Sequence, residues 1–411
     1  MKTFLHGIAY VTFMTIFLSA AQVLAGAKIQ IDDTKSWNIG AGMRASYAAL
    51  EDGAPNGKDW SSDFVTENMR LYMNGQLSEY IKMEFNTDCT NCMGANASGT
   101  MIVLDAIAKF EFSPYFNVWA GRLLAPSDRA ELDGPYYQNT FDFNKTPFYP
   151  QDYGNPGAGA GSRDTGNAAA AGRFGRDDGI NIWGALSEDK RLTYVVGIFD
   201  GLDGLANRDG SPLWAGRFTF NFLEIEKNPG YYTSSTYYGK GGDIFTVAFA
   251  AQHQDGGAGS ATNPGNFTGG SVDALYERIL ADQAVLTLEG EVKVFDADLN
   301  SAALTEGNDC FCLFEGHAWT ATGLYLLPNQ VGMGPLTGQI QPYFRFTENV
   351  PDNSPARDEY ELGLNYVIDG HNARVSLFYQ YGDIATKGRT YTKTQTGDDV
   401  SRIALAVQLQ L

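Results

Sequence analysis

The sequence predicts an all-β protein, an antiparallel transmembrane β-barrel of about 16 strands. Three observations predict this fold. Apolar and polar side chains alternate in many short segments, the number of such segments is even, and the connections between them alternate between long and short. After residue 27 no apolar run is long enough for a spanning helix. A chain that crosses lipid without helices must close its strands into a barrel, because unpaired backbone groups are too costly there.

The clearest alternating segment runs from Glu359 to Tyr381. Tyr360, Leu362 and other apolar residues occupy every second position, with mostly polar residues between them. The pair Asp369-Gly370 interrupts the pattern and predicts a tight hairpin turn. Each strand of this hairpin is about ten residues long, which is enough to cross a bilayer when tilted. We therefore expect one face of each strand to meet lipid and the other to meet an aqueous lumen.

The N-terminus has the pattern of a secretory signal peptide. Lys2 precedes an apolar run from Ile8 to Leu18, and small residues follow. We expect cleavage after Ala25, so that residues 1–25 form the signal peptide and residues 26–411 form the barrel; the small residues Ala25-Gly26-Ala27 offer a second cleavage site. A retained anchor is the alternative. Export of a barrel predicts a location in the bacterial outer membrane.

The predicted strands follow one another along the mature chain. In the first, Ser36–Tyr47, aromatic residues stand at both ends of the apolar face, as expected at the two membrane interfaces. The others are Phe64–Leu77, Ile81–Thr87, Ile102–Phe112, Phe116–Leu123, Gly179–Leu186, Leu192–Phe199, Trp214–Phe222, Ile244–Gln252, Asp273–Leu280, Ala284–Phe295, Gly316–Leu327, Thr337–Phe346, Glu359–Ile368, Arg374–Tyr381 and Val400–Leu411.

The connections predict which end of the barrel faces outward. Long segments follow the odd-numbered strands and short turns follow most even-numbered ones, which is the outer-membrane arrangement with long loops outside. Glu224–Asp243 is the exception, a long connection where a short turn is due. It contains either a hidden strand or an extended turn. The longest connection, 124–178, is rich in Gly, Ala, Asp, Asn and Pro and is either a functional loop or disordered.

Several segments carry a family resemblance in their order and spacing: Arg70–Leu77, Trp119–Pro126, Asp178–Gly184 with Tyr194–Gly201, Gly316–Tyr325 and Leu362–Asn372. In these segments the chain resembles the phosphate-selective porin O/P family of Gram-negative outer membranes. The resemblance implies a homotrimeric 16-stranded channel with an inward-folded third loop, and 124–178 stands where that constriction loop would be. It also implies passive diffusion of small hydrophilic solutes or ions, with no cofactor.

Charged residues on the expected lumen faces bear on selectivity. The basic pore-lining candidates on these faces are Arg44, Arg70, Lys82, Lys109, Arg217, Lys293, Arg345 and Arg374, and the long third loop adds the constriction candidates Arg129 and Lys145. Basic linings favour anions such as phosphate. The same strand faces also carry Glu67, Glu84, Asp105, Glu111, Glu289, Glu291, Glu359 and Glu361. The sequence thus leaves two hypotheses, a mixed-charge lumen with weak selectivity and an anion-selective one.

Four cysteines, Cys89, Cys92, Cys310 and Cys312, fall in two expected loops. In an oxidising compartment we expect disulfides. A bond between the two loops is one option, because Cys310 and Cys312 are too close for comfortable mutual pairing. A metal clip is less favoured, since the mature chain has only three scattered histidines. The CxxC at Cys89 lacks the following His of a c-type haem site.

Other classes of function have little support. No nucleophile motif or phosphate-binding glycine loop stands out, so we do not expect an enzyme. The formal net charge of −19 argues against a nucleic-acid binder. Two alternatives to a channel stay open: a barrel acting as a sleeve or surface partner for another protein, for example a cytochrome, and an adhesin. The expected partners are the lipid bilayer and small solutes.

Overall fold

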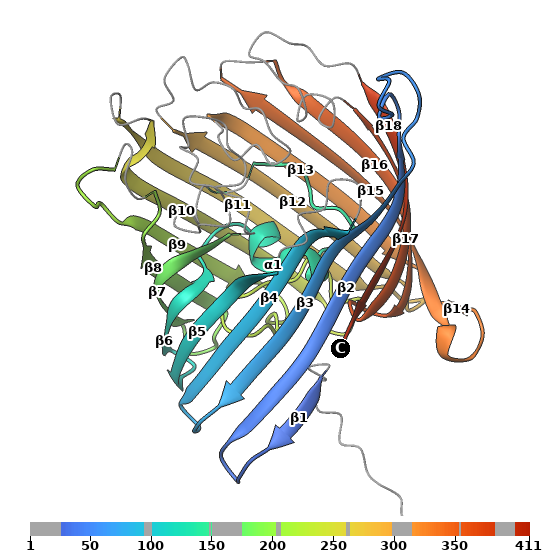
Figure 1. Ribbon diagram of the computed structural model, residues 1–411. Helices are drawn as coiled ribbons and strands as arrows, with labels where there is room; N and C mark the ends of the chain where they lie inside the picture. The colour runs from blue at the N-terminus through green and yellow to red at the C-terminus, as the bar shows by residue number, and fades with distance from the viewer. Residues whose placement is uncertain are drawn as a thin grey trace, which may run out of the picture.

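The computed structural model describes residues 26–93, 101–147, 149, 175–202, 207–259, 264–297, 315–352, 355–382 and 399–411. Sixteen strands form a closed antiparallel barrel, because each strand pairs with the next and β18 pairs with β2 (Figure 1). These strands are β2 (Ser36–Leu50), β3 (Asp63–Gln76), β4 (Ile81–Met93), β5 (Ile102–Ser113), β6 (Phe116–Leu124), β7 (Arg176–Ala185), β8 (Leu192–Phe199), β9 (Leu213–Asn221), β10 (Ile244–Gly259), β11 (Pro264–Ile279), β12 (Val285–Asp296), β13 (Gly316–Leu326), β15 (Gly338–Pro351), β16 (Arg357–Asp369), β17 (Ala373–Gly382) and β18 (Val400–Gln410).

The two ends of the barrel differ in their connections. One end, called here the turn end, carries the short turns and the C-terminus (Figure 1). The opposite end, the loop end, carries most of the long connections. The turns at the turn end are 77–80, 114–115, 186–191, 280–284 and 370–372. The predicted alternation of connection lengths therefore holds for most connections. The exceptions are the short loop-end connections after β10 and β15 and the long turn-end connections after β9 and β13.

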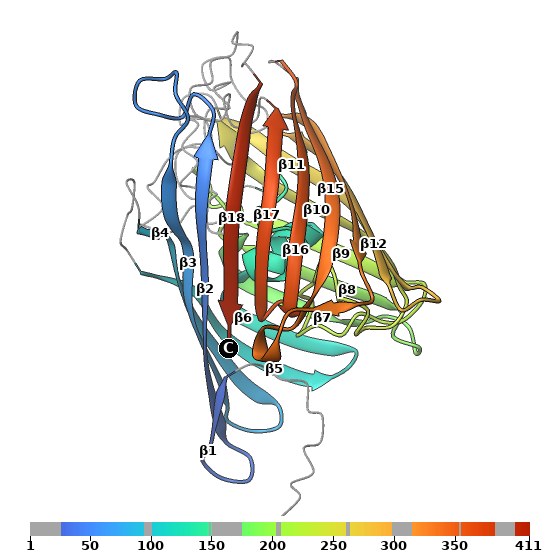
Figure 2. The ribbon, with the colours of Figure 1, turned by 90° about the vertical axis from the view of Figure 1, so that its right-hand side faces the viewer.

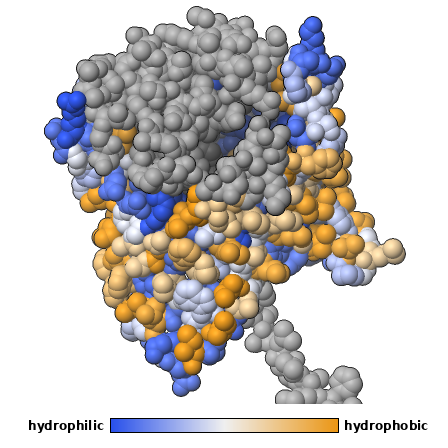
Figure 3. Space-filling view, in the orientation of Figure 1, coloured by the Kyte–Doolittle hydropathy of each residue, from blue (hydrophilic) through white to orange (hydrophobic). Residues whose placement is uncertain are grey.

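The strand faces follow the predicted alternation. On β16 the outward Leu362 is 61% exposed, whereas the neighbouring Glu361 is fully buried in the lumen. On β2 the outward Met43 is 40% exposed and the next residue, Arg44, is 4% exposed. Figure 3 shows apolar residues over the outer face of the strands. The barrel thus has the apolar exterior and charged interior of a membrane-spanning barrel.

Several strands run farther toward the loop end than predicted. β10 continues to Gly259 and β11 begins at Pro264, so most of the long connection expected after the ninth strand is hairpin. β4 continues to Met93, so Cys89 and Cys92 lie in a strand and not in a loop as predicted. The prediction relied on alternating apolar residues, and strands outside the apolar belt do not need them. Backbone hydrogen bonds alone continue the pairing there.

Two short strands and two short helices complete the described elements. β1 (Ala27–Gln30) pairs antiparallel with the start of β2 at the turn end, and β14 (Gln330–Val331) pairs with the start of β15. A 3₁₀ turn, η3 (Gly334–Leu336), follows β14. The helix α1 (Arg129–Tyr137) belongs to the third loop and lies inside the barrel (Figures 1 and 2). Within the described ranges, no helix is long and apolar enough to cross a membrane.

The connection 224–243, called here the turn-end segment, contains neither a helix nor a strand, and the structure describes all of it. The hidden-strand alternative is therefore wrong, and the connection is an extended turn. It enters the lumen from the turn end, where its middle residues, Ser234 to Thr236, are buried. The third loop enters from the opposite end, so two segments meet inside the barrel.

Candidate functional site

The third loop forms a short helix inside the lumen because its sequence supplies a start and a stop. The carboxylate of Asp128 accepts a hydrogen bond from the backbone N–H of Glu131 at 3.0 Å, which caps the start of α1. Gly134, with φ of 61°, and Pro135 then kink the helix. All residues from 129 to 136 are buried. The helix therefore fills space inside the barrel.

Arg129 connects the helix α1 to the turn-end segment and to the barrel wall. Its guanidinium donates two hydrogen bonds to the carboxylate of Glu226, at 2.8 and 2.7 Å. Its Nε also lies 3.3 Å from the carboxylate of Asp273 on β11. Arg217 on β9 binds the same Asp273 at 2.9 Å and donates to the carbonyl of Ser127 at 3.0 Å. Charge-assisted bonds of this kind fix the helix in one position.

Lys293 on β12 lies at the centre of an acidic cluster. Its ammonium group is 2.7 Å from the carboxylate of Asp128, 3.3 Å from Glu291 and 3.8 Å from Glu131. The lysine and all three carboxylates are fully or almost fully buried. Lys293 therefore neutralises carboxylates of the loop and the wall, and it is not a free cation.

Hydroxyl groups of the turn-end segment complete the packing against α1. Ser235 donates to the carboxylate of Asp133 on the helix. Thr236 donates to Glu277 on β11 at 2.7 Å. The backbone N–H of Ser235 also donates to the carbonyl of Tyr137 at 3.1 Å. Short hydroxyl side chains allow the segment to approach the helix closely.

His371, in the turn between β16 and β17, supports the turn-end segment from the opposite side. Its Nε2 lies 3.1 Å from Oγ of Ser234 and 2.9 Å from the carbonyl oxygen of Thr236. Its ring packs against those of Tyr137 and Tyr238. Burial, together with the nearby positive charge of Arg374, lowers the pKa of His371 to about 3. The imidazole is therefore neutral at physiological pH.

Three of the predicted lumen arginines hold the backbone of residues 138–142, which follows α1. Arg374 donates to three carbonyl oxygens of this stretch, at 2.8 to 3.2 Å. Arg345 donates to Thr140 and to the carbonyl of residue 142 at 2.7 and 2.8 Å, and it also pairs with two glutamates of β16. Arg44 donates to the carbonyl of residue 141. These arginines therefore hold this part of the third loop against the lumen wall.

On the wall formed by β3, β4 and β5, each predicted basic residue pairs with a carboxylate on a neighbouring strand. The pairs are Arg70–Asp88 at 2.8 Å, Lys82–Glu111 and Lys109–Glu84. The ammonium group of Lys109 also lies 3.9 Å from the ring centre of Trp119, a cation–π contact. The basic side chains of this wall are therefore matched by acidic ones.

The charges around Asp142 are less deeply buried than those of the helix. Arg402 on β18 lies 2.6 Å from the Asp142 carboxylate, and Lys145 lies 3.9 Å from it. The side chain of Lys145 is 32% exposed, that of Arg402 is 20% exposed and that of Asp142 is 15% exposed. These three groups place both signs of charge at one partly exposed position inside the barrel.

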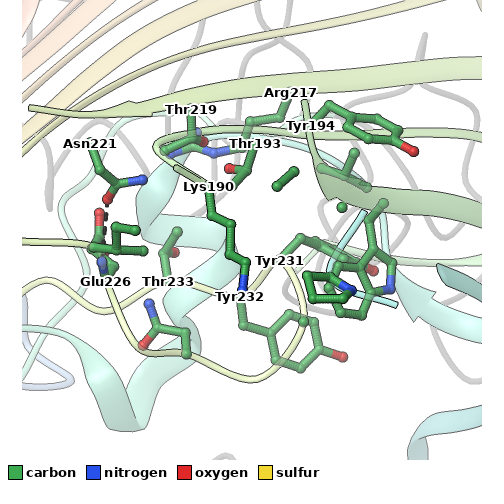
Figure 4. A pocket seen from close by; sticks show the side chains of 18 residues that line it. Lys190, Thr193, Tyr194, Arg217, Thr219, Asn221, Glu226, Tyr231, Tyr232 and Thr233 are labelled. Carbon is green, nitrogen blue, oxygen red and sulfur yellow. Dashed lines mark hydrogen bonds between the residues drawn. The ribbon is translucent and has the colours of Figure 1, made fainter. Parts of the chain in front are cut away.

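A cavity lies at the turn end, between the wall of β7–β9 and the turn-end segment (Figure 4). Its lining includes Trp183, Lys190 and Asn221 from the wall region, and Glu226 and Tyr232 from the segment. The Nε1 of Trp183 and the hydroxyl of Tyr232 are buried there, and neither has a hydrogen-bond partner among the residues that the structure describes. The cavity therefore offers hydrogen-bonding groups to water or to a small polar solute.

Burial changes the acidity of the carboxyl groups around α1. It raises the pKa of Asp133 well above its usual range, and the nearby Glu289 adds to the effect. It raises the pKa of Glu131 in the same way, together with the charge of Asp128. For Glu226 burial acts in the same direction, but the charge and hydrogen bonds of Arg129 outweigh it and lower the pKa to about 2.

The structure thus places the predicted basic residues on the lumen wall or on the third loop, in contact with acidic or carbonyl groups. The sequence alone did not single out Glu226, Asp273 and Asp142, which pair with Arg129, Arg217 and Lys145. It also did not single out Arg402, the second partner of Asp142. The unexpected length of 224–243 was the one signal that pointed toward Glu226. The loop itself spans residues 125–175, slightly shorter than the predicted 124–178, because β6 and β7 extend into it.

Of the four cysteines, the described residues settle the state of one. Cys89 is disulfide-bonded. The side chain of Cys92, and Cys310 and Cys312 as a whole, lie outside the described residues. The pairing therefore stays a prediction.

Comparison with known proteins identifies the fold. No protein-family model matches the chain, and no curated protein matches it. Similar solved structures include an anion-selective porin from Comamonas acidovorans (12% identical, TM-score 0.55, covering 92% of this chain and all of that one). OmpF from Salmonella typhi, in complex with daunomycin, is 10% identical, with a TM-score of 0.53 over 94% of this chain and all of that one. OprB from Pseudomonas putida is also 10% identical, with a TM-score of 0.53, and covers 91% of this chain and 94% of that one. Similarity at this level of identity shows a shared barrel fold.

Proposed function

We propose that this protein is an outer-membrane porin, a water-filled barrel through which small hydrophilic solutes and ions diffuse passively. The observation that carries the proposal is a closed barrel with an apolar outer face and a charged lumen, narrowed by an inward-folded loop. An apolar exterior fits lipid, and a charged interior fits water and ions. The solved structures with the same fold include porins, among them one named as anion-selective.

The proposed mechanism is size exclusion with a weak electrostatic bias, and it has no catalytic step. The constriction consists of α1, residues 138–147 and the turn-end segment. The ten predicted basic residues belong to it or to the surrounding wall, where they position the loop and match acidic groups. An anion-selective pore needs cations that replace the lost hydration of the ion. Lysines and arginines that already hold carboxylates or carbonyls serve this purpose poorly, so we favour a mixed-charge pore over a phosphate-selective one.

Three further parts of the assignment rest on the sequence pattern. We propose that residues 1–25 are removed on export, that the mature chain forms a homotrimer, and that its relatives are the phosphate-selective O/P porins. Mass spectrometry of the purified protein should give an N-terminus at Gly26. Chemical cross-linking in membranes should give a ladder that ends at three copies. A mature chain that begins at Met1 would contradict export by cleavage.

Liposome swelling tests the channel proposal directly. Purified, folded protein is placed in liposomes, which are then exposed to neutral sugars of increasing size. We expect swelling with monosaccharides and progressively slower swelling with di- and trisaccharides, because the constriction excludes by size. Liposomes containing heat-unfolded protein are the control. Folded protein that admits no sugar and no ion would contradict the proposal and favour a barrel that serves as a sleeve or an adhesin.

A further inference from the structure

A hairpin at the turn end leaves the barrel wall and projects outward. It comprises residues 327–338, which include β14 and η3 and connect β13 to β15. Figure 1 shows it standing away from the wall, and Figure 2, turned by 90°, shows it in front of the lower ends of β16 and β17. Other turns at this end, such as 77–80 and 280–284, connect neighbouring strands directly.

The outward position of this hairpin is held by Tyr366, an outward-facing residue of β16. The hydroxyl of Tyr366 donates to the carbonyl oxygens of Val331, at 2.9 Å, and of Leu336. Gly332 adopts a φ of 99°, and a Cβ at this position would collide with the Tyr366 hydroxyl. The hairpin is therefore packed on a specific side chain of the outer face.

The composition of the hairpin is unusual for a segment that faces water. Residues 327–338 contain no charged side chain. Met333 is 86% exposed, Leu336 is 65% exposed and Val331 is 44% exposed. By contrast, the turn 186–191 at the same end contains four consecutive charged residues, Glu188 to Arg191. An exposed, uncharged apolar tip indicates a surface that something apolar covers.

The position of the hairpin along the barrel axis indicates that lipid covers its apolar side chains. Tyr366 lies near the turn end of β16, and Tyr325 occupies an outward position at the same end of β13. Outward aromatic residues at strand ends mark the boundary between lipid tails and head groups. The outward apolar face of β16 continues from this boundary through Leu364 and Leu362. The hairpin is thus continuous with the lipid-facing surface.

We propose that residues 327–338 form a membrane-interface anchor. The side chains of Val331, Met333 and Leu336 enter the boundary between head groups and acyl chains in the leaflet at the turn end. This proposal rests on the membrane location in the proposed function. Lipid fits better than a second copy of the chain, because a stable protein interface buries roughly 800 Å² on each partner and three apolar side chains supply only a small part of that.

Photo-crosslinking tests the anchor. A benzophenone side chain replaces Met333 in the full-length chain, and the protein is reconstituted in phosphatidylethanolamine/phosphatidylglycerol vesicles that contain a tagged phospholipid. We expect a lipid adduct within about two-fold of that from a benzophenone at Leu362, a residue of the lipid-facing belt. A benzophenone at Lys190, in the charged turn of the same end, should give a several-fold weaker adduct.

A second variant tests how the hairpin is held. Tyr366→Phe removes the hydroxyl that binds the two carbonyl groups, and it should lower the adduct at position 333 without changing the adduct at position 362. A two-copy adduct from position 333, or no lipid adduct there while position 362 reacts, would overturn the anchor and leave the channel proposal intact. Loss of the adduct at position 362 would instead contradict the membrane location itself.

Discussion

Single residues in this lumen act mainly by fixing the loop. The side chains of Arg129 and Lys293 are fully or almost fully buried, and each contacts more than one carboxylate. An uncompensated buried charge is strongly destabilising, so each member of such a cluster depends on the others. Charged side chains therefore fix the position of the third loop inside the barrel.

The Arg129–Glu226 ion pair gives the first prediction. Glu226→Gln keeps the size of the side chain but replaces the carboxylate beside Arg129 with a neutral amide. Removing one charge of a buried ion pair lowers the stability of the fold by about 3 kcal/mol. We expect the turn-end segment to loosen and single-channel conductance to rise. The matched control is Glu111→Gln, which breaks the more exposed pair with Lys82. Equal conductance in the wild type and in Glu226→Gln would show that this pair does not limit the pore.

The neutral His371 gives a pH prediction. Its folded pKa, about 3, lies below the ordinary value of 6.5, so the unfolded segment binds the proton more readily between these values. The contact with the turn-end segment should therefore weaken as the pH falls below about 6.5, by about 2 kcal/mol at pH 5.

Hydrogen exchange of residues 233–238, corrected for the intrinsic effect of pH, measures this change. The groups around His371 are Arg374, Lys240, Tyr137 and Tyr238. His371→Gln should reduce the pH dependence of this protection and leave the part that comes from Asp133, which binds Ser235 of the segment. The same pH dependence in both proteins would assign the effect to another group.

At the scale of elements, α1 docks against a glycine on the wall. Gly42 lies on the lumen face of β2, and a Cβ at this position would lie 2.8 Å from the ring of Tyr136. Gly42→Val should therefore displace the helix and change the conductance, while the barrel remains heat-stable. The control is Ala41→Val, one position along on the outward face. Unchanged conductance in Gly42→Val would mean that the helix does not narrow the pore.

The elements differ in how well the sequence predicts them. All sixteen barrel strands follow from alternation, because lipid and lumen impose opposite chemistry on neighbouring residues. The ends of β10, β11 and β4 do not, since alternation fades where strands leave the lipid. α1 was missed because it is short and contains Gly134 and Pro135.

The sequence also does not predict how the third loop and the turn-end segment contact each other. Arg129 and Glu226 lie on two different connections, far apart along the chain. No local pattern shows that these connections enter the lumen from opposite ends and meet there. The basic residues of the strands, and acidic partners such as Glu84 and Glu111, could be assigned to the lumen from strand alternation. The specific pairs, and partners on the connections such as Glu226, could not.

At the scale of the whole molecule, the barrel strands and the two inward segments have different structural roles. The strands provide a rigid apolar exterior, and the two inward segments occupy its charged interior. Their opposite points of entry mean that both ends of the barrel contribute to the constriction. If the protein is a porin, its permeability depends on contacts between connections more than on the number of strands.

Single-channel recording in a planar bilayer under a KCl gradient tests the central claim most directly. We expect discrete conductance steps, because an open lumen conducts ions, and a reversal potential close to zero, because acidic and basic groups lie side by side around the proposed constriction. A large reversal potential of either sign would contradict the mixed-charge lumen. Folded, inserted protein that conducts no current would contradict the channel itself.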